Sequence, residues 1–202
     1  MGELILLRHG ETEWSRSGRH TGRTDVPLTA RGEAAAAALA PDLAGRRIVA
    51  VLTSPAARAT RTAELAGLTD AKPDADLWEW DYGGYEGRTT QEIKAGRPGW
   101  YLWRDGVVPG DAAHPGESVS QVGERADRVL GRVRPLVDGG DVALVAHGHV
   151  LRVLTARWLG LEPSAGRLFR LDTGTVCVLG TEHAEPAIVS WNLPPGALRH
   201  EA

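Results

Sequence analysis

The arginine, histidine and glycine at positions 8–10 follow an apolar run, residues 4–7, that predicts a short buried strand. Ligands of open α/β sheets bind at the carboxyl ends of strands. The guanidinium of Arg8 offers a planar fork of donors that suits phosphate oxygens, and a neutral imidazole at His9 can act as a nucleophile. An Arg-His pair alone is also typical of a solvated loop, so partners elsewhere in the chain must support phosphoryl chemistry here.

Two further strand-to-helix junctions carry similar side chains. Arg58 lies one turn into a predicted helix, after a buried strand predicted over residues 48–53, and His147 follows a strand predicted over residues 141–146. If these strands are neighbours of the first one, their carboxyl ends meet at one edge of the sheet. Two arginines, two histidines and a helix N-terminus would then surround one crevice, which suits a phosphoryl dianion.

Strands alternate with helices along the chain, which predicts an α/β fold: a three-layer sandwich with helices on both faces of a mostly parallel central sheet. The length of 202 residues indicates one domain, 1–202. An irregular, glycine-rich insertion at about 70–117, with one short helix near 90–94, is expected to lie over the site as a cap. The other predicted elements are helices at 30–43, 55–66, 118–137 and 149–159 and closing strands at 168–171, 175–179 and 187–191.

Composition narrows the class of protein. The formal net charge of -3 argues against a nucleic-acid partner. The single cysteine, Cys177, excludes an intramolecular disulfide and a Cys-based zinc site, and its apolar neighbours predict a buried side chain. Because no apolar run approaches a membrane span and the chain enters a strand at once without a targeting segment, we expect a cytoplasmic protein with no membrane partner.

Six segments match one known family in content and in order: LRHGET at 7–12, DVPLTARG at 25–32, SPAARATRTA at 54–63, EWDYGGYEG at 79–87, PGES at 115–118 and VAHG at 145–148. With these segments the chain resembles the histidine phosphatase superfamily, which includes the cofactor-dependent phosphoglycerate mutases. Each segment is weak alone, but together they are highly specific and span nearly the whole chain. The run at 79–87 is most similar to actinobacterial acid phosphatases and to sedoheptulose bisphosphatase-like members.

The resemblance implies a role for each matching residue. His9 is the nucleophile that becomes a phosphohistidine, and Glu79 stands at the position of the proton donor, with Asp81 and Glu86 as alternatives. The phosphoryl group is expected to be bound by Arg8, Arg58 and His147, with Ser15, Thr21 and Gly148 as further phosphate-binding positions. Substrate contacts are expected from Trp78, Tyr82, Trp100, Trp103 and Arg104.

Elementary electrostatics fits these roles. Arg8 and Arg58 disfavour the imidazolium form of His9 and so keep the nucleophile neutral. His147 is expected to be protonated and to donate to the phosphoryl oxygens, a state that the bound anion supports. Burial of Glu79 among tryptophans would favour the protonated form that a general acid needs.

We therefore predict a metal-independent phosphatase, a phosphoric monoester hydrolase of the acid phosphatase type. Its substrate is expected to be a small phosphorylated metabolite, most simply a sugar phosphate, and its intermediate a phosphohistidine. A phosphoglycerate mutase is the alternative, but the insertion is shorter and less basic than in glycolytic mutases, which favours hydrolysis. An inactive protein that only binds a phosphorylated metabolite is the alternative from another class, and the complete His, Arg and Glu set argues against it.

No cofactor and no metal are expected. A metallohydrolase built on His9, His147 and His149 lacks clustered carboxylates, and the arginines would repel a cation. A homodimer stays an open alternative for the assembly. Arg61 is predicted to be structural, and Arg152 to form structural ion pairs. Four histidines are predicted to lie on the surface: His20, His114, His183 and His200. Residues 194–202 are predicted to form a flexible tail.

Overall fold

Alternating side chains along the first strand build a core on each face of the sheet. In the computed structural model, which describes residues 2–198, the strand β1 (Leu4–Arg8) is buried from its first residue to its fourth. Leu4 and Leu6 belong to one cluster of buried apolar side chains, whereas Ile5 and Leu7 belong to another. A period of two therefore places this strand in the middle layer of a sandwich.

The sheet is mixed and has the strand order β3-β2-β4-β1-β5-β6. The four strands from β3 to β1 run parallel, and β5 and β6 add antiparallel pairs at the other end. The prediction of a parallel sheet core is thus confirmed. The other strands are β2 (Ile48–Thr53), β3 (Lys72–Pro73), β4 (Asp141–Ala146), β5 (Val176–Glu182) and β6 (Glu185–Leu193).

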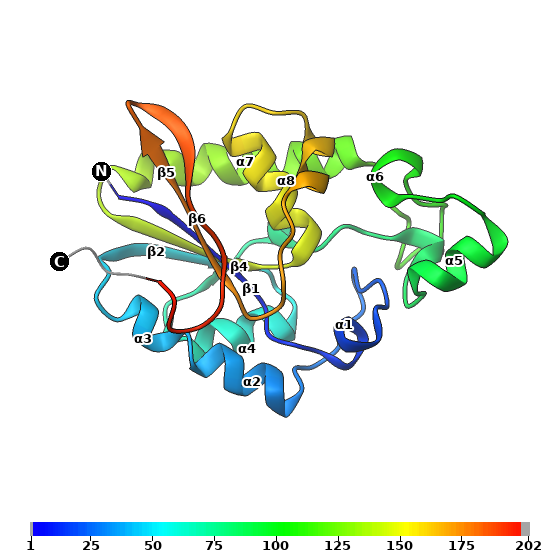
Figure 1. Ribbon diagram of the computed structural model, residues 1–202, viewed down its shortest axis with the longest axis horizontal. Helices are drawn as coiled ribbons and strands as arrows, with labels where there is room; N and C mark the ends of the chain where they lie inside the picture. Colours follow the sequence, from blue (N-terminus) through cyan, green and yellow to red (C-terminus); the bar gives the residue numbers. More distant parts are fainter. Residues whose placement is uncertain (1, 199–202) are drawn as a thin grey trace.

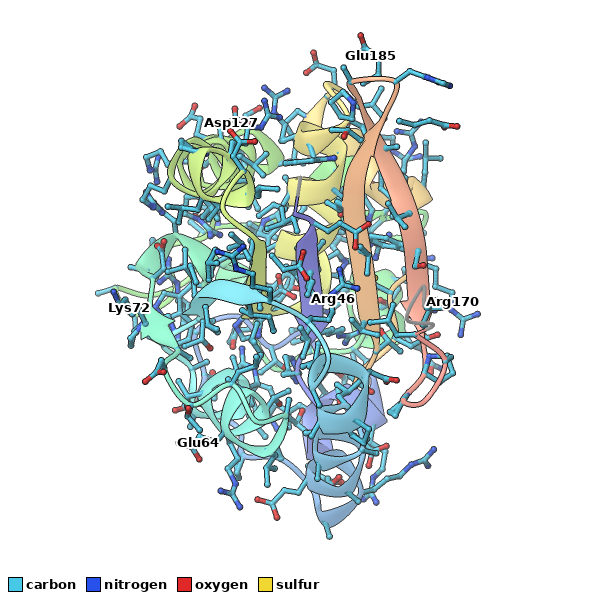
Figure 2. All side chains as sticks on the ribbon, turned by 90° about the vertical axis from the view of Figure 1, so that its left-hand side faces the viewer. Arg46, Glu64, Lys72, Asp127, Arg170 and Glu185 are labelled. Atoms are coloured by element: carbon cyan, nitrogen blue, oxygen red, sulfur yellow. The ribbon has the colours of Figure 1, made fainter. Side chains whose placement is uncertain are left out.

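Helices cover both faces of the sheet. The α-helices are α1 (Glu13–Ser17), α2 (Ala30–Ala37), α3 (Ala40–Leu43), α4 (Ala57–Leu65), α5 (Thr90–Gly96), α6 (Leu102–Asp105), α7 (Val119–Val137) and α8 (Gly148–Trp158), and three short 3₁₀ helices are η1 (Ala75–Leu77), η2 (Gly83–Tyr85) and η3 (Pro163–Leu168). In Figure 1, α7 and α8 lie above the strands, α2, α3 and α4 below them, and α1, α5 and α6 beyond one end. Figure 2 looks from the opposite end and shows Asp127 of α7 and Glu64 of α4 on opposite sides of the strands.

The register of the sheet brings the three predicted junctions together. Arg8 at the end of β1 lies beside Ala146 at the end of β4, and Thr53 at the end of β2 lies beside Val145. Because β4 lies between β1 and β2, the residues that follow all three strands gather at one edge. This is the end at which α1 lies in Figure 1.

Two predicted helices differ from the structure in their ends. The helix predicted over residues 30–43 is interrupted between α2 and α3, because Pro41 lacks an amide donor and its ring would clash with the preceding turn. The helix predicted from Pro55 begins at Ala57 instead. Ser54 accepts a hydrogen bond from the amide of Ala56 at 3.3 Å but lies outside the helix.

The predicted strand at residues 168–171 is wrong. Two side chains from neighbouring segments, Arg8 and Trp191, donate to the carbonyls of Leu171 and Arg170, and the segment has no strand partner. The predicted tail at residues 194–202 is also corrected where the structure describes it. Leu198 is buried in the apolar cluster that contains Ile5 and Leu7, and the amide of Gly196 donates to the carboxylate of Asp42 at 2.7 Å.

The insertion at residues 70–117 contains the two-residue strand β3, η1, η2, α5 and α6. Three of its tryptophans are buried: Trp80, Trp100 and Trp103 join the apolar cluster above the sheet. Trp80 meets Trp103 edge to face, with ring centroids 5.6 Å apart. Among residues 2–198, no helix combines the length and the apolar character needed to cross a membrane.

Candidate active site

His9 directly follows β1, and one of its two ring nitrogens forms a hydrogen bond. Its Nδ1 lies 2.7 Å from the carbonyl oxygen of Gly10, which can only accept, so Nδ1 carries the proton and Nε2 has a free lone pair. Burial and the charges of Arg58 and Arg8 hold the pKa of His9 well below its ordinary value. The expected neutral imidazole is therefore what the geometry provides.

Arg8 supplies an unused donor beside this imidazole. Its Nη1 donates to the carbonyl of Leu171, while its Nε is buried and has no hydrogen-bond partner among residues 2–198. A buried donor without a partner costs about 1–3 kcal/mol, so an anion that accepts from it would recover that free energy. Gly148 lies against the guanidinium, since a Cβ there would stand 3.1 Å from Arg8 Cζ.

Arg58 and His147 lie behind His9 and are fully buried. Arg58 Nε donates to His147 Nδ1 at 3.2 Å, and His147 Nε2 lies 2.7 Å from Ser54 Oγ. Burial and Arg58 hold the pKa of His147 well below its ordinary value. Because its Nδ1 accepts a hydrogen bond, the ring is neutral here, and a protonated His147 beside a bound phosphoryl group stays a prediction.

The loop before α2 holds Arg58 in place. The guanidinium of Arg58 donates to the carbonyls of Thr24 at 2.9 Å and Gly22 at 3.0 Å. The carboxylate of Asp25 accepts from the amide of Ala57 at 3.0 Å and so supplies the side-chain cap that α4 otherwise lacks. The motif at residues 25–32 thus orients a site residue without lining the site.

Glu79 is buried, and its carboxylate faces the N-terminus of α8. It accepts backbone hydrogen bonds, each 2.9 Å long, from Trp80, His149 and Val150. These three bonds fix the orientation of the Glu79 carboxyl group at the N-terminus of α8.

The alternative carboxylates have other partners. Asp81 accepts from the amides of Gly83 at 2.9 Å and Gly116 at 3.1 Å, and Glu86 accepts from those of Gly22 at 2.9 Å and Thr24 at 3.1 Å. Both side chains brace loops and neither lines the cavity described next. The geometry therefore favours Glu79 as the proton-transfer group.

A cavity of about 250 Å³ opens in front of His9. Its volume lies below the range of about 300–1,000 Å³ that is common for drug-sized ligands, which indicates a small substrate. Seven predicted site residues line it: Arg8, His9, Ser15, Thr21, Glu79, Tyr82 and Gly148. The sequence analysis missed seven more: Gly18, Arg19, His20, Thr90, His149, Arg152 and Leu171.

Four of the predicted substrate residues do not line this cavity. Trp100 and Trp103 pack into the apolar cluster instead, because burying large rings away from water outweighs exposing them. Arg104 lies on the surface and donates to Asp105. The ring of Trp78 is parallel to that of His147, with centroids 6.5 Å apart, and the guanidinium of Arg23 lies over the Trp78 ring.

Two residues predicted to be remote from chemistry lie in the cavity wall. His20, predicted on the surface, packs edge to face on Tyr82 at 4.9 Å and its Nδ1 lies 2.7 Å from the carbonyl of Arg88. Arg152, predicted to form ion pairs, donates instead to the carbonyls of Gly166 and Arg167. Helical spacing could have found Arg152, because it lies four residues after Gly148 on the same face of α8.

Other predicted positions fall outside the cavity. Arg61 forms ion pairs with Glu33 and Glu64, as the structural prediction expects. His200 lies outside the described residues. Within residues 2–198, no three His, Cys, Asp or Glu side chains gather as a group that could hold a metal ion.

Comparison with known proteins agrees with this geometry. The profile of the histidine phosphatase superfamily (branch 1) matches residues 4–194. An acid phosphatase of Mycobacterium tuberculosis is 42% identical over 183 residues, which cover 89% of this chain and 87% of that protein. The sedoheptulose 1,7-bisphosphatase of Saccharomyces cerevisiae is 37% identical over 193 residues, 78% of this chain and 67% of that protein.

Solved structures agree as well. The structure of a Mycobacterium tuberculosis open reading frame superposes with a TM-score of 0.89 at 38% identity, covering 96% of this chain and 98% of that one. The chain therefore belongs to the histidine phosphatase superfamily, branch 1, as a phosphoric monoester hydrolase.

Proposed function

We propose that this protein hydrolyses small phosphomonoesters without a metal, through a phosphohistidine at His9. The observation that carries the proposal is the pairing of a neutral His9, whose Nδ1 donates a hydrogen bond to the Gly10 carbonyl, with Nε of Arg8, which has no partner among residues 2–198. One group offers a lone pair at Nε2, and the other offers a donor to the oxygens of the phosphoryl group. The names of the similar acid phosphatase and sedoheptulose bisphosphatase support hydrolysis and a sugar phosphate substrate.

In the first step, His9 Nε2 forms a bond to phosphorus while the bond from phosphorus to the ester oxygen breaks. The ester oxygen leaves with a proton that Glu79 gives it, so an alcohol departs and the phosphoryl group stays on His9. Arg8 offsets the charge on the transferring group, and Arg58 and His147 support it from behind. Because phosphoryl transfer depends chiefly on positioning and charge stabilisation, these fixed donors are the main contribution of the protein.

In the second step, the Glu79 carboxylate takes a proton from a water molecule, whose oxygen bonds to phosphorus. The bond from phosphorus to Nε2 breaks, inorganic phosphate leaves and His9 regains its lone pair. Glu79 is protonated again and ready for the next turnover. The three backbone donors on Glu79 hold its carboxylate in one orientation through both steps.

The insertion at about 70–117 supplies Glu79, Tyr82 and Thr90 to the cavity wall. We infer that it acts as a cap within one domain, 1–202, and that it leaves a path for water. A phosphoglycerate mutase would have to keep water from the phosphohistidine, so the fate of the phosphoryl group separates the two activities.

The test is p-nitrophenyl phosphate hydrolysis in excess chelator, combined with mass spectrometry of the rapidly quenched His9 peptide. We expect metal-free phosphate release and an acid-labile phosphoryl group on wild-type His9, with both absent in His9→Ala. Full activity of His9→Ala would refute the covalent mechanism. Turnover of 3-phosphoglycerate that needs 2,3-bisphosphoglycerate and releases little phosphate would establish the mutase instead.

A further inference from the structure

The PGES segment at residues 115–118 is one of the six segments that match the family, yet none of its residues lines the active-site cavity. Its serine caps α7, because Ser118 Oγ accepts from the amide of Gln121 at 3.2 Å. Its glutamate forms a bidentate ion pair: Glu117 accepts from Nε of Arg125 at 2.7 Å and from Nη2 at 2.9 Å. The side chains of Arg125 and Glu117 are 8% and 13% exposed. The segment thus acts through a pair that lies almost wholly out of water.

The other donors of Arg125, which belongs to α7, bind the backbone that carries Glu79. Nη1 donates to the carbonyls of Asp76 at 2.6 Å and Trp78 at 2.9 Å, and Nη2 donates to the carbonyl of Glu79 at 3.4 Å. All five N–H groups of the guanidinium therefore have an acceptor. Because the guanidinium is planar and rigid, it fixes the main chain of residues 76–79 relative to α7.

Glu117 holds the chain that follows Glu79. Its carboxylate accepts from the amide of Asp81 at 2.9 Å, and its own amide donates to the carbonyl of Asp81 at 3.0 Å. Its carbonyl accepts from the indole of Trp80 at 2.8 Å. Arg125 and Glu117 together therefore contact the chain before, at and after Glu79.

Glu79 is fixed from two helices. Arg125 of α7 binds its carbonyl, and the amides of His149 and Val150 at the start of α8 bind its carboxylate at 2.9 Å. A buried ion pair is a weak source of stability, since apolar side chains of similar volume often replace one without loss. The effect of this pair is geometric, because a proton donor must lie within hydrogen-bond reach of the leaving oxygen. A displacement of about 1 Å can lower a rate about a hundredfold.

We propose that Arg125 is a positioning residue for proton transfer by Glu79, and that Glu117 orients Arg125 for this role. The inference rests on the proposed phosphatase function and adds the residues that place its proton donor. Because Arg125 is not among the described residues that line the cavity, it acts through Glu79 and leaves the attack of His9 on phosphorus unchanged. Its loss should therefore slow the reactions that need a general acid and spare those that do not.

The test compares two substrates that differ in their leaving group. Glycerol 1-phosphate releases an alkoxide that needs a proton, whereas p-nitrophenyl phosphate releases a phenolate that is stable without one. Arg125→Lys keeps the charge, but a single ammonium cannot bind the carboxylate and the three carbonyls at once. In Arg125→Lys, kcat/KM should fall about tenfold more for glycerol 1-phosphate than for p-nitrophenyl phosphate.

Two comparisons separate positioning from a general loss of structure. Arg128→Lys changes another arginine of α7, which forms an exposed ion pair with Asp76, and should keep the wild-type ratio of the two kcat/KM values. In a Glu79→Gln background no proton donor is left to position, so adding Arg125→Lys should not change that ratio further. A merely structural role would change the ratio equally in both backgrounds or in neither.

A wild-type ratio in Arg125→Lys, or the same tenfold change when it is added to Glu79→Gln, would overturn the inference. If Arg125→Lys does not fold, the double variant Arg125→Gln/Glu117→Gln removes both charges together and leaves neither buried without its partner. It should show the same shift in the ratio, and a wild-type ratio there would equally overturn the positioning role. An unchanged ratio in Glu79→Gln would remove the proton donor and this inference with it. Absence of metal-free p-nitrophenyl phosphate hydrolysis in wild type would refute the phosphatase function itself.

Discussion

Arg58 donates a hydrogen bond from its Nε to Nδ1 of His147 over 3.2 Å, and both side chains are fully buried behind His9. The other two nitrogens of Arg58, Nη1 and Nη2, donate to the carbonyls of Thr24, Gly22 and Thr21. The charge of Arg58 thus reaches the nucleophile through space, because it is the foremost charge that lowers the pKa of His9 after burial itself. Positioning His147 and tuning His9 are therefore two effects of one side chain.

Replacing Arg58 by glutamine should move the pH dependence of catalysis. Removing the positive charge raises the pKa of His9 toward its ordinary value, so His9 becomes protonated at a higher pH. The acid limb of the kcat/KM profile should shift upward by about one pH unit. The rate at the optimum should fall about a hundredfold, because His147 and the loop of Gly22 and Thr24 lose the guanidinium that positions them. The profile is measured with p-nitrophenyl phosphate, so the titration of the substrate cancels between variants.

Arg58→Lys is the matched control because it retains the charge. It should lose activity through misplaced hydrogen bonds while keeping its acid limb near that of wild type. An unchanged acid limb in Arg58→Gln would contradict the electrostatic coupling between Arg58 and His9.

Asp25 should stabilise the protein through the first turn of α4. Its carboxylate accepts from the amide of Ala57 at 3.0 Å and lies 3.8 Å from Arg58 Nη1. Asp25→Ala should lower the free energy of unfolding by about 1 kcal/mol, as the loss of a helix cap does. Asp25→Asn can still accept that hydrogen bond and should retain most of the stability. Urea unfolding checks this, and equal losses in the two variants would argue against the cap.

The sequence predicts the strand-tip side of the site better than the opposite wall. Arg8, His9 and His147 follow strands whose parallel order could be inferred, so their convergence follows from the topology of the sheet. Helical spacing places Arg152 on the same face of α8 as Gly148, but the contacts that orient its guanidinium depend on how η3 and the insertion pack against α8, which no local pattern encodes. Trp100 is predicted to contact the substrate, but its ring is buried in the apolar core, because burial of a large apolar surface is favourable.

Gly148→Ala should disturb phosphate binding without disturbing the fold. The new methyl group would lie 3.1 Å from Arg8 Cζ and 3.3 Å from its Nε, so the guanidinium must shift by a few tenths of an ångström. A small displacement of a positioning group can lower kcat/KM by about tenfold or more. Steady-state kinetics with p-nitrophenyl phosphate and inhibition by inorganic phosphate provide the measurement.

Gly131→Ala on α7 is the control for that substitution. Beyond its own turn of α7, no atom of residues 2–198 lies within 4 Å of the position that its Cβ would take, so activity should stay at the wild-type level. Loss of activity in both variants would point to a general effect of substitution and not to Arg8.

Glu79→Gln should depend on the leaving group. Loss of a general acid typically costs about 10²–10⁴-fold, but a leaving group that is already stable as an anion needs little protonation. The rate of phosphorylation should therefore fall strongly for glycerol 1-phosphate and much less for p-nitrophenyl phosphate. Asp81→Asn should affect both substrates alike, since Asp81 braces Gly83 and Gly116 and lies outside the cavity. Equal losses on both substrates in Glu79→Gln would remove Glu79 from the role of proton donor.

Stability should fall as the solution becomes mildly acidic. Burial holds the pKa values of His9, His147 and His149 well below the ordinary value in the folded protein. The unfolded chain takes up protons on these rings as the pH drops below about 6.5, while the folded protein does not, so protonation favours unfolding. Each ring should remove roughly 1 kcal/mol from the free energy of unfolding between about pH 7.5 and 5.5.

His149→Gln isolates one of the three contributions. Urea unfolding at several pH values should give a shallower loss of stability on acidification, by about one proton in the slope, because one buried ring no longer titrates. His183→Asn, which removes an exposed imidazole from the turn between β5 and β6, is the matched control for the loss of a histidine. Asparagine suits that control because residue 183 has a φ of 50°, which asparagine tolerates better than most residues. An identical slope in His149→Gln and wild type would show that His149 does not oppose folding at low pH.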